Sequence, residues 1–129
     1  MKELPLSVDV KCLDAPSVQG RKMKVVMIPF TGKGYGEYFN GEIIGTGCDT
    51  QKITNDGRAV LSARYMLEGT DRAGQKCRIF IENTVHDENG WHPVIVTDSG
   101  CLAEWETLDL TATVDPAPEG VLVRIYREV

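Results

Sequence analysis

Apolar and polar residues alternate along most of this chain, and this period of two limits its fold more than any other feature of the sequence. Residues 8–12, 58–68, 76–83 and 121–128 each place apolar side chains on one side of an extended segment. A half-buried strand of an antiparallel sheet requires this pattern, because successive side chains point to opposite faces. Residues 22–30 become apolar on both faces after Val25, which indicates a more covered strand. The sequence therefore predicts a protein built almost entirely from antiparallel strands.

Glycine-containing turns separate these strands. "NDG" at 55–57 and "DRAG" at 71–74 combine glycines that tolerate positive φ with Asn and Asp side chains that bond to nearby backbone. The two turns bound the strand 58–68 on both sides, which predicts consecutive hairpins in a meander. The best helix candidate, residues 100–106, is short and leads directly into the strand-like segment 107–114.

We expect one domain over residues 1–129, since no internal repeat, low-complexity tract or linker divides the sequence. About eight short strands favour an all-β antiparallel meander closed into a small β-barrel, because closure removes unpaired strand edges. A two-sheet sandwich is the alternative. A barrel of about eight strands has an interior that side chains fill or that holds one small ligand.

Charge and hydropathy exclude several classes of partner. The net charge of −5 offers no basic surface to nucleic acid or to an anionic membrane. No apolar run approaches the roughly 18 residues that a membrane-spanning helix needs. Glu3 and Pro5 stand where an export signal would have its apolar segment, so we expect a cytoplasmic protein with no nucleic-acid or membrane partner.

The four cysteines, Cys12, Cys48, Cys77 and Cys101, form no C-x-x-C pair, so neither a zinc ribbon nor a redox motif is indicated. In a reducing cytoplasm we expect them to be small apolar fillers rather than disulfide partners.

Two segments, "GEYFNGEIIGTGCDTQ" and "DGRAVLSARYMLEGTDRAGQKCRIFIEN", resemble a bacterial and fungal family of small single-domain proteins catalogued as a domain of unknown function. Its members typically carry a G-G-x-D-x-Q-like segment, a D-G turn, an A-R-Y strand, a second D-G turn and a strand that ends in Asn. The resemblance covers roughly residues 20–128; here "GTGCD" replaces the paired glycines and "DRAG" replaces the direct D-G. It implies a lipocalin-like or calycin-like barrel and carries no established activity.

The resemblance makes Asp49, Arg64, Tyr65 and Asn83 the candidate ligand-binding residues. Strand alternation places the Tyr65 ring and the Asn83 amide inside the barrel, where a few polar groups in an apolar lumen can orient a small molecule. The same alternation points Arg64 outward, towards Asp49 or Glu82 at the barrel mouth. A one-residue slip in register would exchange Arg64 and Tyr65.

Each candidate also has a purely structural interpretation. The Tyr65 hydroxyl can bond to backbone, and Asn83 can bond to the turn that follows its strand. Asp49 can complete an Asx-type turn. Arg64 in a surface ion pair would contribute only about 0–1 kcal/mol to stability.

The stretch "VHDENGWHP" (85–93) contains His86, Asp87, Glu88 and His92, which are residue types that bind metals. The spacing matches no helical or strand metal motif, so we predict no metal site. For general acid–base chemistry, His92 or His86 is the natural proton carrier, and Asp49 is the carboxylate candidate.

The glycine-rich segment 30–41 lacks the residue order of a phosphate loop, and no helix follows it. We interpret it as a flexible connection in which Tyr35, Tyr38 and Phe39 cover one end of the barrel. Trp91 and Trp105 are pocket-lining or core residues.

These observations favour a protein that binds a small apolar or aromatic molecule in the barrel lumen, without a cofactor. The first alternative is a cofactor-independent isomerase, cyclase or lyase that transfers a proton through a carboxylate or a histidine. The second is a structural homo-oligomer with a filled lumen that associates through its Phe80 or Tyr126 face.

Overall fold

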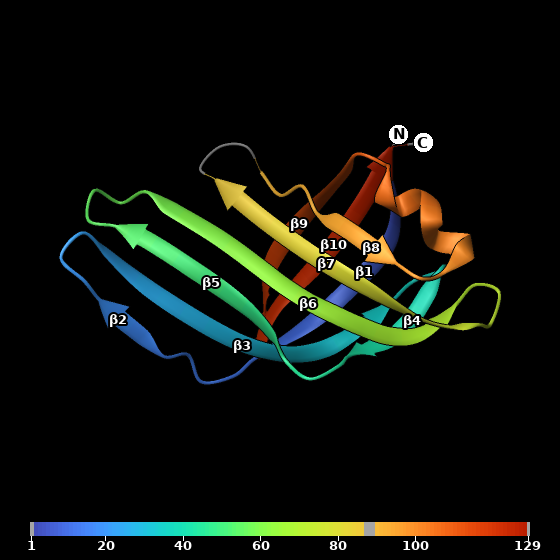
Figure 1. Ribbon diagram of the computed structural model, residues 1–129, viewed down its shortest axis with the longest axis horizontal. Helices are drawn as coiled ribbons and strands as arrows, with labels where there is room; N and C mark the ends of the chain where they lie inside the picture. Colours follow the sequence, from blue (N-terminus) through green and yellow to red (C-terminus); the bar gives the residue numbers. More distant parts are fainter. Residues whose placement is uncertain (1, 87–89, 129) are drawn as a thin grey trace.

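The computed structural model describes residues 2–86 and 90–128 and consists of ten strands and one 3₁₀ helix, η2 (Figure 1). All pairings between strands are antiparallel. The elements are β1 (Lys2–Cys12), β2 (Ser17–Gln19), β3 (Met23–Tyr35), β4 (Phe39–Ile43), β5 (Gly47–Thr54), β6 (Ala59–Asp71), β7 (Lys76–His86), β8 (Val94–Thr97), η2 (Gly100–Glu106), β9 (Leu110–Ala117) and β10 (Gly120–Glu128).

The strands form one sheet that closes into a β-barrel. The order across the sheet is β8-β7-β6-β4-β3-β1-β10-β9, and the backbone N–H of Ala112 in β9 donates to the carbonyl of Trp91 at 3.1 Å. This bridge joins the segment before β8 to the far edge of the sheet. The predicted barrel is therefore confirmed, and the sandwich alternative is wrong.

β4 and β5 lie end to end between β3 and β6. β5 pairs with the first part of β3 and with Ala59–Arg64 of β6, whereas β4 pairs with the last part of each strand. The break falls at residues 44–46, where Gly45 has a φ of 63°, a left-handed conformation that favours glycine. The glycine-containing segment 45–47 thus marks the point at which β5 follows β4 as the strand between β3 and β6.

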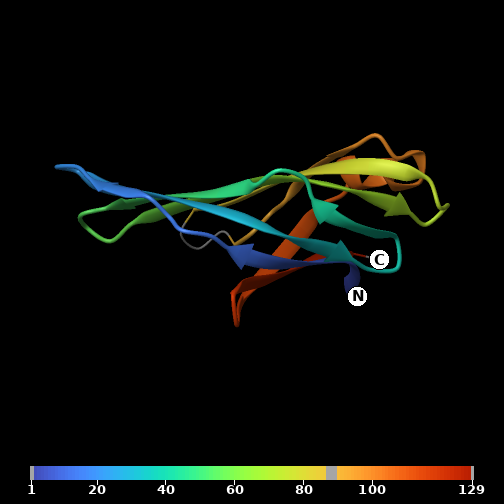
Figure 2. The same cartoon turned by 90° about the horizontal axis from the view of Figure 1, so that it is seen from below.

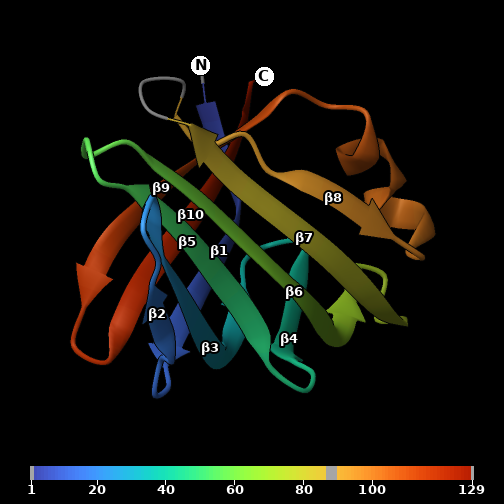
Figure 3. The ribbon, with the colours of Figure 1, turned by 60° about the vertical axis from the view of Figure 1, so that its left-hand side comes forward.

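The two ends of the described chain are neighbouring strands. β1 pairs with β10 from Lys2 opposite Glu128 to Lys11 opposite Gly120, and it pairs with β3 on its other side. The N and C labels lie together in Figures 1 and 3.

β3 and β6 are each 13 residues long and extend beyond the barrel wall. Figure 2 shows the β2–β3 and β5–β6 hairpin ends projecting away from the rest of the molecule. The opposite end of the barrel is filled by a core in which Phe39, Leu67 and Ile79 are fully buried and Trp105 of η2 is 2% exposed.

The predicted strands are confirmed, because the strand-like segments of the sequence fall in β1, β3, β6, β7 and β10. The predicted turns contain Gly57 and Gly74, which have positive φ, and the predicted helix at residues 100–106 is η2. The flexible connection predicted at 30–41 is wrong, because β3 runs through Tyr35 and β4 begins at Phe39. Position 32 inside β3 requires glycine, because a Cβ atom there would lie 1.9 Å from the carbonyl oxygen of Asp9 on β1.

All four cysteines are free thiols. Cys77 is a buried filler as predicted, but Cys12 and Cys101 are exposed, so the filler interpretation is wrong for those two. Within residues 2–86 and 90–128, no helix is long and apolar enough to cross a bilayer.

Candidate binding site in the barrel lumen

The barrel lumen holds a partly open cavity of about 210 Å³ at the end away from η2. Its wall is mostly apolar and is contributed by seven strands together with the segment that precedes β8. The lining residues are Val10, Cys12, Ile28, Phe30, Asp49, Gln51, Leu61, Ala63, Tyr65, Asn83, Trp91, Val114, Val121 and Val123. The lumen is therefore filled at one end and hollow at the other.

Tyr65 points into this cavity from β6, as the alternation predicts, and is 5% exposed. Its ring meets the Phe30 ring edge-on, with centroids 5.3 Å apart. Gly47 leaves room for both rings, because a Cβ atom there would lie 2.5 Å from the Phe30 ring and 2.7 Å from the Tyr65 Cβ. Within the described chain the buried Tyr65 hydroxyl has no hydrogen-bond partner, and burial raises its pKa.

Asp49 and Asn83 face each other across Ala63. The three residues stand directly opposite one another on β5, β6 and β7, in one row of the inner face. Neighbouring strands are about 4.8 Å apart, so the two polar residues are separated by about 10 Å of backbone, with only a methyl group between them. Tyr65 lies two residues along β6 on the same face, and the three polar side chains thus converge on one region of the cavity.

Two of these polar groups are acceptors with unused capacity. Asn83 is 3% exposed, and neither its Oδ1 nor Oδ1 of Asp49 meets a hydrogen-bond donor from the described residues. The other Asp49 oxygen accepts a hydrogen bond from Nε2 of Gln51 at 3.0 Å. Burial raises the pKa of Asp49, and the Gln51 hydrogen bond opposes this shift. Among residues 2–86 and 90–128, neither the Tyr65 hydroxyl nor Oδ1 of Asn83 has the backbone or turn partner that the structural alternative expects.

Cys12 lies at the cavity wall on β1 and shares its electrostatic environment with Asp49. Although Cys12 is exposed as a residue, partial desolvation of its thiol, followed by the nearby Asp49 charge, raises the pKa of this thiol. Asp49 is thus the one formally charged side chain among the described lining residues, and no cationic group lines the cavity there.

Arg64 lies on the outer surface of β6. Its Nε is 2.7 Å from a carboxylate oxygen of Glu82, and its side chain is 66% exposed. Of the four residues that the family resemblance brought together, the structure therefore assembles Asp49, Tyr65 and Asn83 and places Arg64 on the other side of the wall. The outward direction follows from strand alternation, as does the pairing with Glu82.

His92 is placed outside the cavity wall. Its Nδ1 is 3.7 Å from a carboxylate oxygen of Asp109, and its side chain is 56% exposed. Asp87 and Glu88 of the metal-like stretch lie outside the described residues. In the part of the chain that is described, no group of three or more metal-ligating side chains is found.

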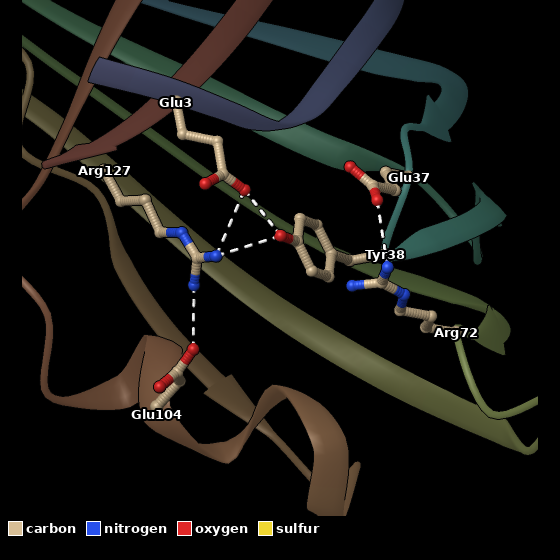
Figure 4. A network of polar contacts seen from close by, with 6 residues as sticks. All are labelled: Glu3, Glu37, Tyr38, Arg72, Glu104 and Arg127. Carbon is tan, nitrogen blue, oxygen red and sulfur yellow. Dashed lines mark hydrogen bonds and ion pairs between the residues drawn. The ribbon is translucent and has the colours of Figure 1, made fainter. Parts of the chain in front are cut away.

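A polar network closes the other end of the barrel (Figure 4). The Tyr38 hydroxyl donates to Oε1 of Glu3 at 2.6 Å, and Arg127 donates to the same oxygen at 3.1 Å and to Glu104 of η2 at 2.7 Å. The guanidinium groups of Arg127 and Arg72 each lie 5.0 Å from the centre of the Tyr38 ring. The hydrogen bond from Tyr38 lowers the pKa of Glu3.

Sequence reasoning identified Tyr38 as covering a barrel end but missed its partners Glu3 and Arg127. The signal was available in part: Arg127 continues the inward-facing parity of Val121, Val123 and Ile125 at the end of β10. Sequence reasoning placed Leu61 on the inward side with Tyr65, as the structure has it, but it missed Gln51, which lies two residues from Asp49 on the same face of β5.

The fold and the cavity define a small β-barrel protein with a pocket in its lumen, and known proteins share this fold. No protein-family model matches the chain. A UPF0311 protein of Clostridium acetobutylicum, which is uncharacterised, is 39% identical over 75 residues, spanning 55% of this chain and 44% of that protein. The match thus covers less than half of the relative's length.

Several solved structures resemble nearly the whole chain, among them the following three. A protein of unknown function from Clostridium acetobutylicum has a TM-score of 0.81 at 23% identity, covering 98% of this chain and 95% of that one. An enzyme from Penicillium herquei has a TM-score of 0.78 at 16% identity, covering 98% and 92%. A β-barrel-like protein from Acinetobacter baumannii has a TM-score of 0.67 at 16% identity, covering 98% and 96%.

At these identities the likeness shows the fold alone, and it agrees with the barrel. The expected similarity to uncharacterised bacterial proteins is confirmed. The A-R-Y and Asn motif, the calycin-like subclass and the roles of the motif residues stay predictions.

Proposed function

We propose that this protein binds a small, neutral, apolar or aromatic molecule in the barrel lumen, oriented by Tyr65, Asn83 and Asp49. The observation that carries the proposal is the set of buried polar atoms at the cavity wall that lack partners in the described chain. A buried polar group without a partner costs roughly 1–3 kcal/mol, so such groups in one cavity indicate a ligand that completes them.

The chemistry of the wall favours a hydrogen-bond donor on the ligand. The free atoms on Asp49 and Asn83 are acceptors, and the Tyr65 hydroxyl can donate or accept. An anionic ligand would meet the Asp49 carboxyl in a cavity whose described lining holds no cation. Size is also suitable, since an engineered cavity of about 150 Å³ already accepts benzene.

The test uses three bicyclic probes of one shape: naphthalene, 2-naphthol and 2-naphthoate. Thermal shift and fluorescence titration should give the tightest binding for 2-naphthol, about two- to tenfold weaker binding for naphthalene and the weakest for the anionic naphthoate.

Tyr65→Phe should weaken 2-naphthol binding severalfold and leave naphthalene binding unchanged, because only the hydroxyl is removed. Tyr35→Phe, on a tyrosine that is 42% exposed, is the matched control. Failure of all three probes to bind contradicts the proposal, as does 2-naphthol binding that tolerates the loss of the Tyr65, Asn83 and Asp49 polar groups together.

A second candidate function is a cofactor-independent enzyme in which Asp49 transfers a proton. Two observations favour it: burial raises the pKa of this lumenal carboxyl, as proton-transfer residues require, and the Penicillium herquei protein of similar fold is described as an enzyme. The Asp49 carboxylate would take an α-proton from a ketone, and the resulting enolate oxygen would accept a hydrogen bond from the Tyr65 hydroxyl.

This second candidate is tested with 2-tetralone, a neutral bicyclic ketone, in deuterated buffer. An enzyme would speed deuterium incorporation at the acidic α-carbon as followed by NMR, and Asp49→Asn would abolish the acceleration while 2-tetralone still binds. Binding without faster exchange assigns the lumen to a carrier of small molecules instead.

A further inference from the structure

The outer wall of the barrel carries a row of apolar side chains that crosses three strands. Met66 on β6 stands directly opposite Phe80 on β7, which stands directly opposite Val96 on β8. Met66 is 36% exposed, Val96 51% and the neighbouring Val94 53%, while Phe80 is partly exposed. An outward-facing apolar patch of this kind on a barrel marks a contact surface, because single exposed apolar residues are common but adjoining ones are not.

Charged pairs border this apolar row on both sides. Above it, Arg64 on β6 pairs with Glu82 on β7 at 2.7 Å. On the other side of the row the two charges are exchanged between the strands: Glu68 on β6 pairs with Arg78 on β7 at 2.8 Å. Lys76 lies 3.6 Å from Glu68. Each of the two main pairs stands directly opposite in the register, so the surface has the sequence Arg–Met–Glu along β6 and Glu–Phe–Arg along β7.

This arrangement is complementary to itself under one particular rotation. A two-fold axis that runs across the strands, along the Met66–Phe80–Val96 row, brings the apolar row against its own copy. The same rotation places Arg64 against the partner's Glu68 and Glu82 against the partner's Arg78. A two-fold axis parallel to β7 would instead place Glu82 against the partner's Glu82, and like charges in contact are repulsive.

We propose that the protein forms a two-fold symmetric dimer through this outer face of β6, β7 and β8, with the axis along the apolar row. The contact is isologous, and the two sheets pack face to face with their strands nearly antiparallel. Arg64 therefore has a role in association rather than in the lumen. The lumenal cavity is lined by the opposite faces of β6 and β7, so the dimer does not depend on the ligand.

The first experiment is sedimentation velocity over a concentration series in the micromolar range. The wild-type protein should sediment as a dimer that dissociates on dilution, and Phe80→Glu should give a monomer at every concentration. Val18→Glu places the same charge on another exposed apolar residue, 64% exposed on β2, and should leave the dimer intact. A wild-type protein that is monomeric throughout, or a Phe80→Glu variant that still dimerises, overturns the proposal.

The second experiment exchanges charges without breaking the pairs within one chain. The double variant R64E/E82R keeps its internal pair with reversed polarity but faces like charges across the proposed axis, and E68R/R78E does the same on the other side. Each variant alone should dimerise about tenfold or more weakly than the wild type.

Mixing the two double variants should restore a heterodimer, because every facing pair is then of opposite charge. The quadruple variant that carries all four exchanges should restore the homodimer. Recovery in both cases supports the two-fold geometry, since a misfolded variant would not regain association on mixing. Double variants that dimerise normally, or a mixture that stays monomeric, contradict it.

Discussion

At the scale of the single residue, the two carboxylate oxygens of Asp49 have different surroundings. One carboxylate oxygen accepts a hydrogen bond from Gln51, and the other is buried against an apolar cavity without a donor from the described chain. Burial raises its pKa above the ordinary value of 3.8 because the charged form loses hydration. The folded protein therefore binds the Asp49 proton more tightly than the unfolded chain does.

This difference predicts the pH dependence of stability at Asp49. Between the ordinary value and the raised folded pKa, the native state holds more protons, so the free energy of unfolding falls as pH rises. The cost is complete above the folded pKa and absent below the ordinary one. At pH 7 the free energy of unfolding of Asp49→Asn should therefore exceed that of the wild type by on the order of 1 kcal/mol. This difference in stability should shrink as the pH falls.

Urea unfolding from about pH 7 down to about pH 3.5 measures this difference. Both proteins lose stability in acid, because hydrogen bonds and charges lower the pKa values of carboxyls such as Glu68 and Asp71 in the folded state. The difference between the unfolding free energies of the two proteins at each pH therefore reports Asp49 alone. Asp9→Asn, on the outward face of β1, controls for the loss of one acidic charge. A variant advantage that is constant with pH or grows towards acid would show that burial is not the cause.

At the scale of the element, β5 shapes the cavity as much as its polar residues do. Its first residue, Gly47, lies against the rings of Phe30 and Tyr65, and its third, Asp49, supplies the carboxyl. The preceding break, where β4 ends and β5 begins, sets the register that brings Asp49 opposite Ala63. The floor of the cavity therefore depends on a glycine that has no polar role.

Gly47→Ala should destabilise the protein and perturb the lumen. The added methyl group must displace the Phe30 and Tyr65 rings, and overpacking of this kind costs roughly 1–3 kcal/mol. Chemical unfolding gives the stability change, and 2-naphthol titration reports the lumen. Gly100→Ala is the control, because a Cβ atom there meets nothing within 4 Å. Equal stability of the two variants would mean that the rings relax freely.

The same elements show what could be predicted from the sequence. Alternation along residues 58–68 and 76–83 was sufficient to place Tyr65 and Asn83 inside and Arg64 outside, since each strand has one buried face. The end-to-end arrangement of β4 and β5 was not predictable, because a glycine break is also compatible with a hairpin. The strand parity of Asp49 was hidden for the same reason, and an Asx turn remained an equal interpretation until the pairing of β5 with β3 and β6 was known.

At the scale of the whole molecule, the barrel has a filled end and a hollow end that different parts of the same strands provide. On β1, Glu3 belongs to the polar network and Val10 to the cavity wall; on β10, Arg127 and Val121 divide in the same way. These pairings join segments more than 100 residues apart in the sequence, as in the contact between Glu3 and Arg127. Local patterns carry no information about such pairings, which is why the network escaped sequence analysis.

The network predicts that the filled end stabilises the fold without contributing to the lumen. The Arg127 side chain is 13% exposed and joins β10 to Glu3 of β1 and Glu104 of η2, so Arg127→Met leaves the Glu3 carboxylate without its cation. Loss of one partner from a buried pair costs about 3–5 kcal/mol, and partial solvent access should reduce this to roughly 1–3 kcal/mol. Urea unfolding should show this loss relative to Arg21→Met, which removes an exposed arginine beyond the end of β2.

Affinity for 2-naphthol should stay unchanged in Arg127→Met, since several residues of β1 and β10 separate the network from the cavity. A variant with normal stability would show that the network does not stabilise the fold, and altered affinity for 2-naphthol would show that the two ends are coupled through β1 and β10.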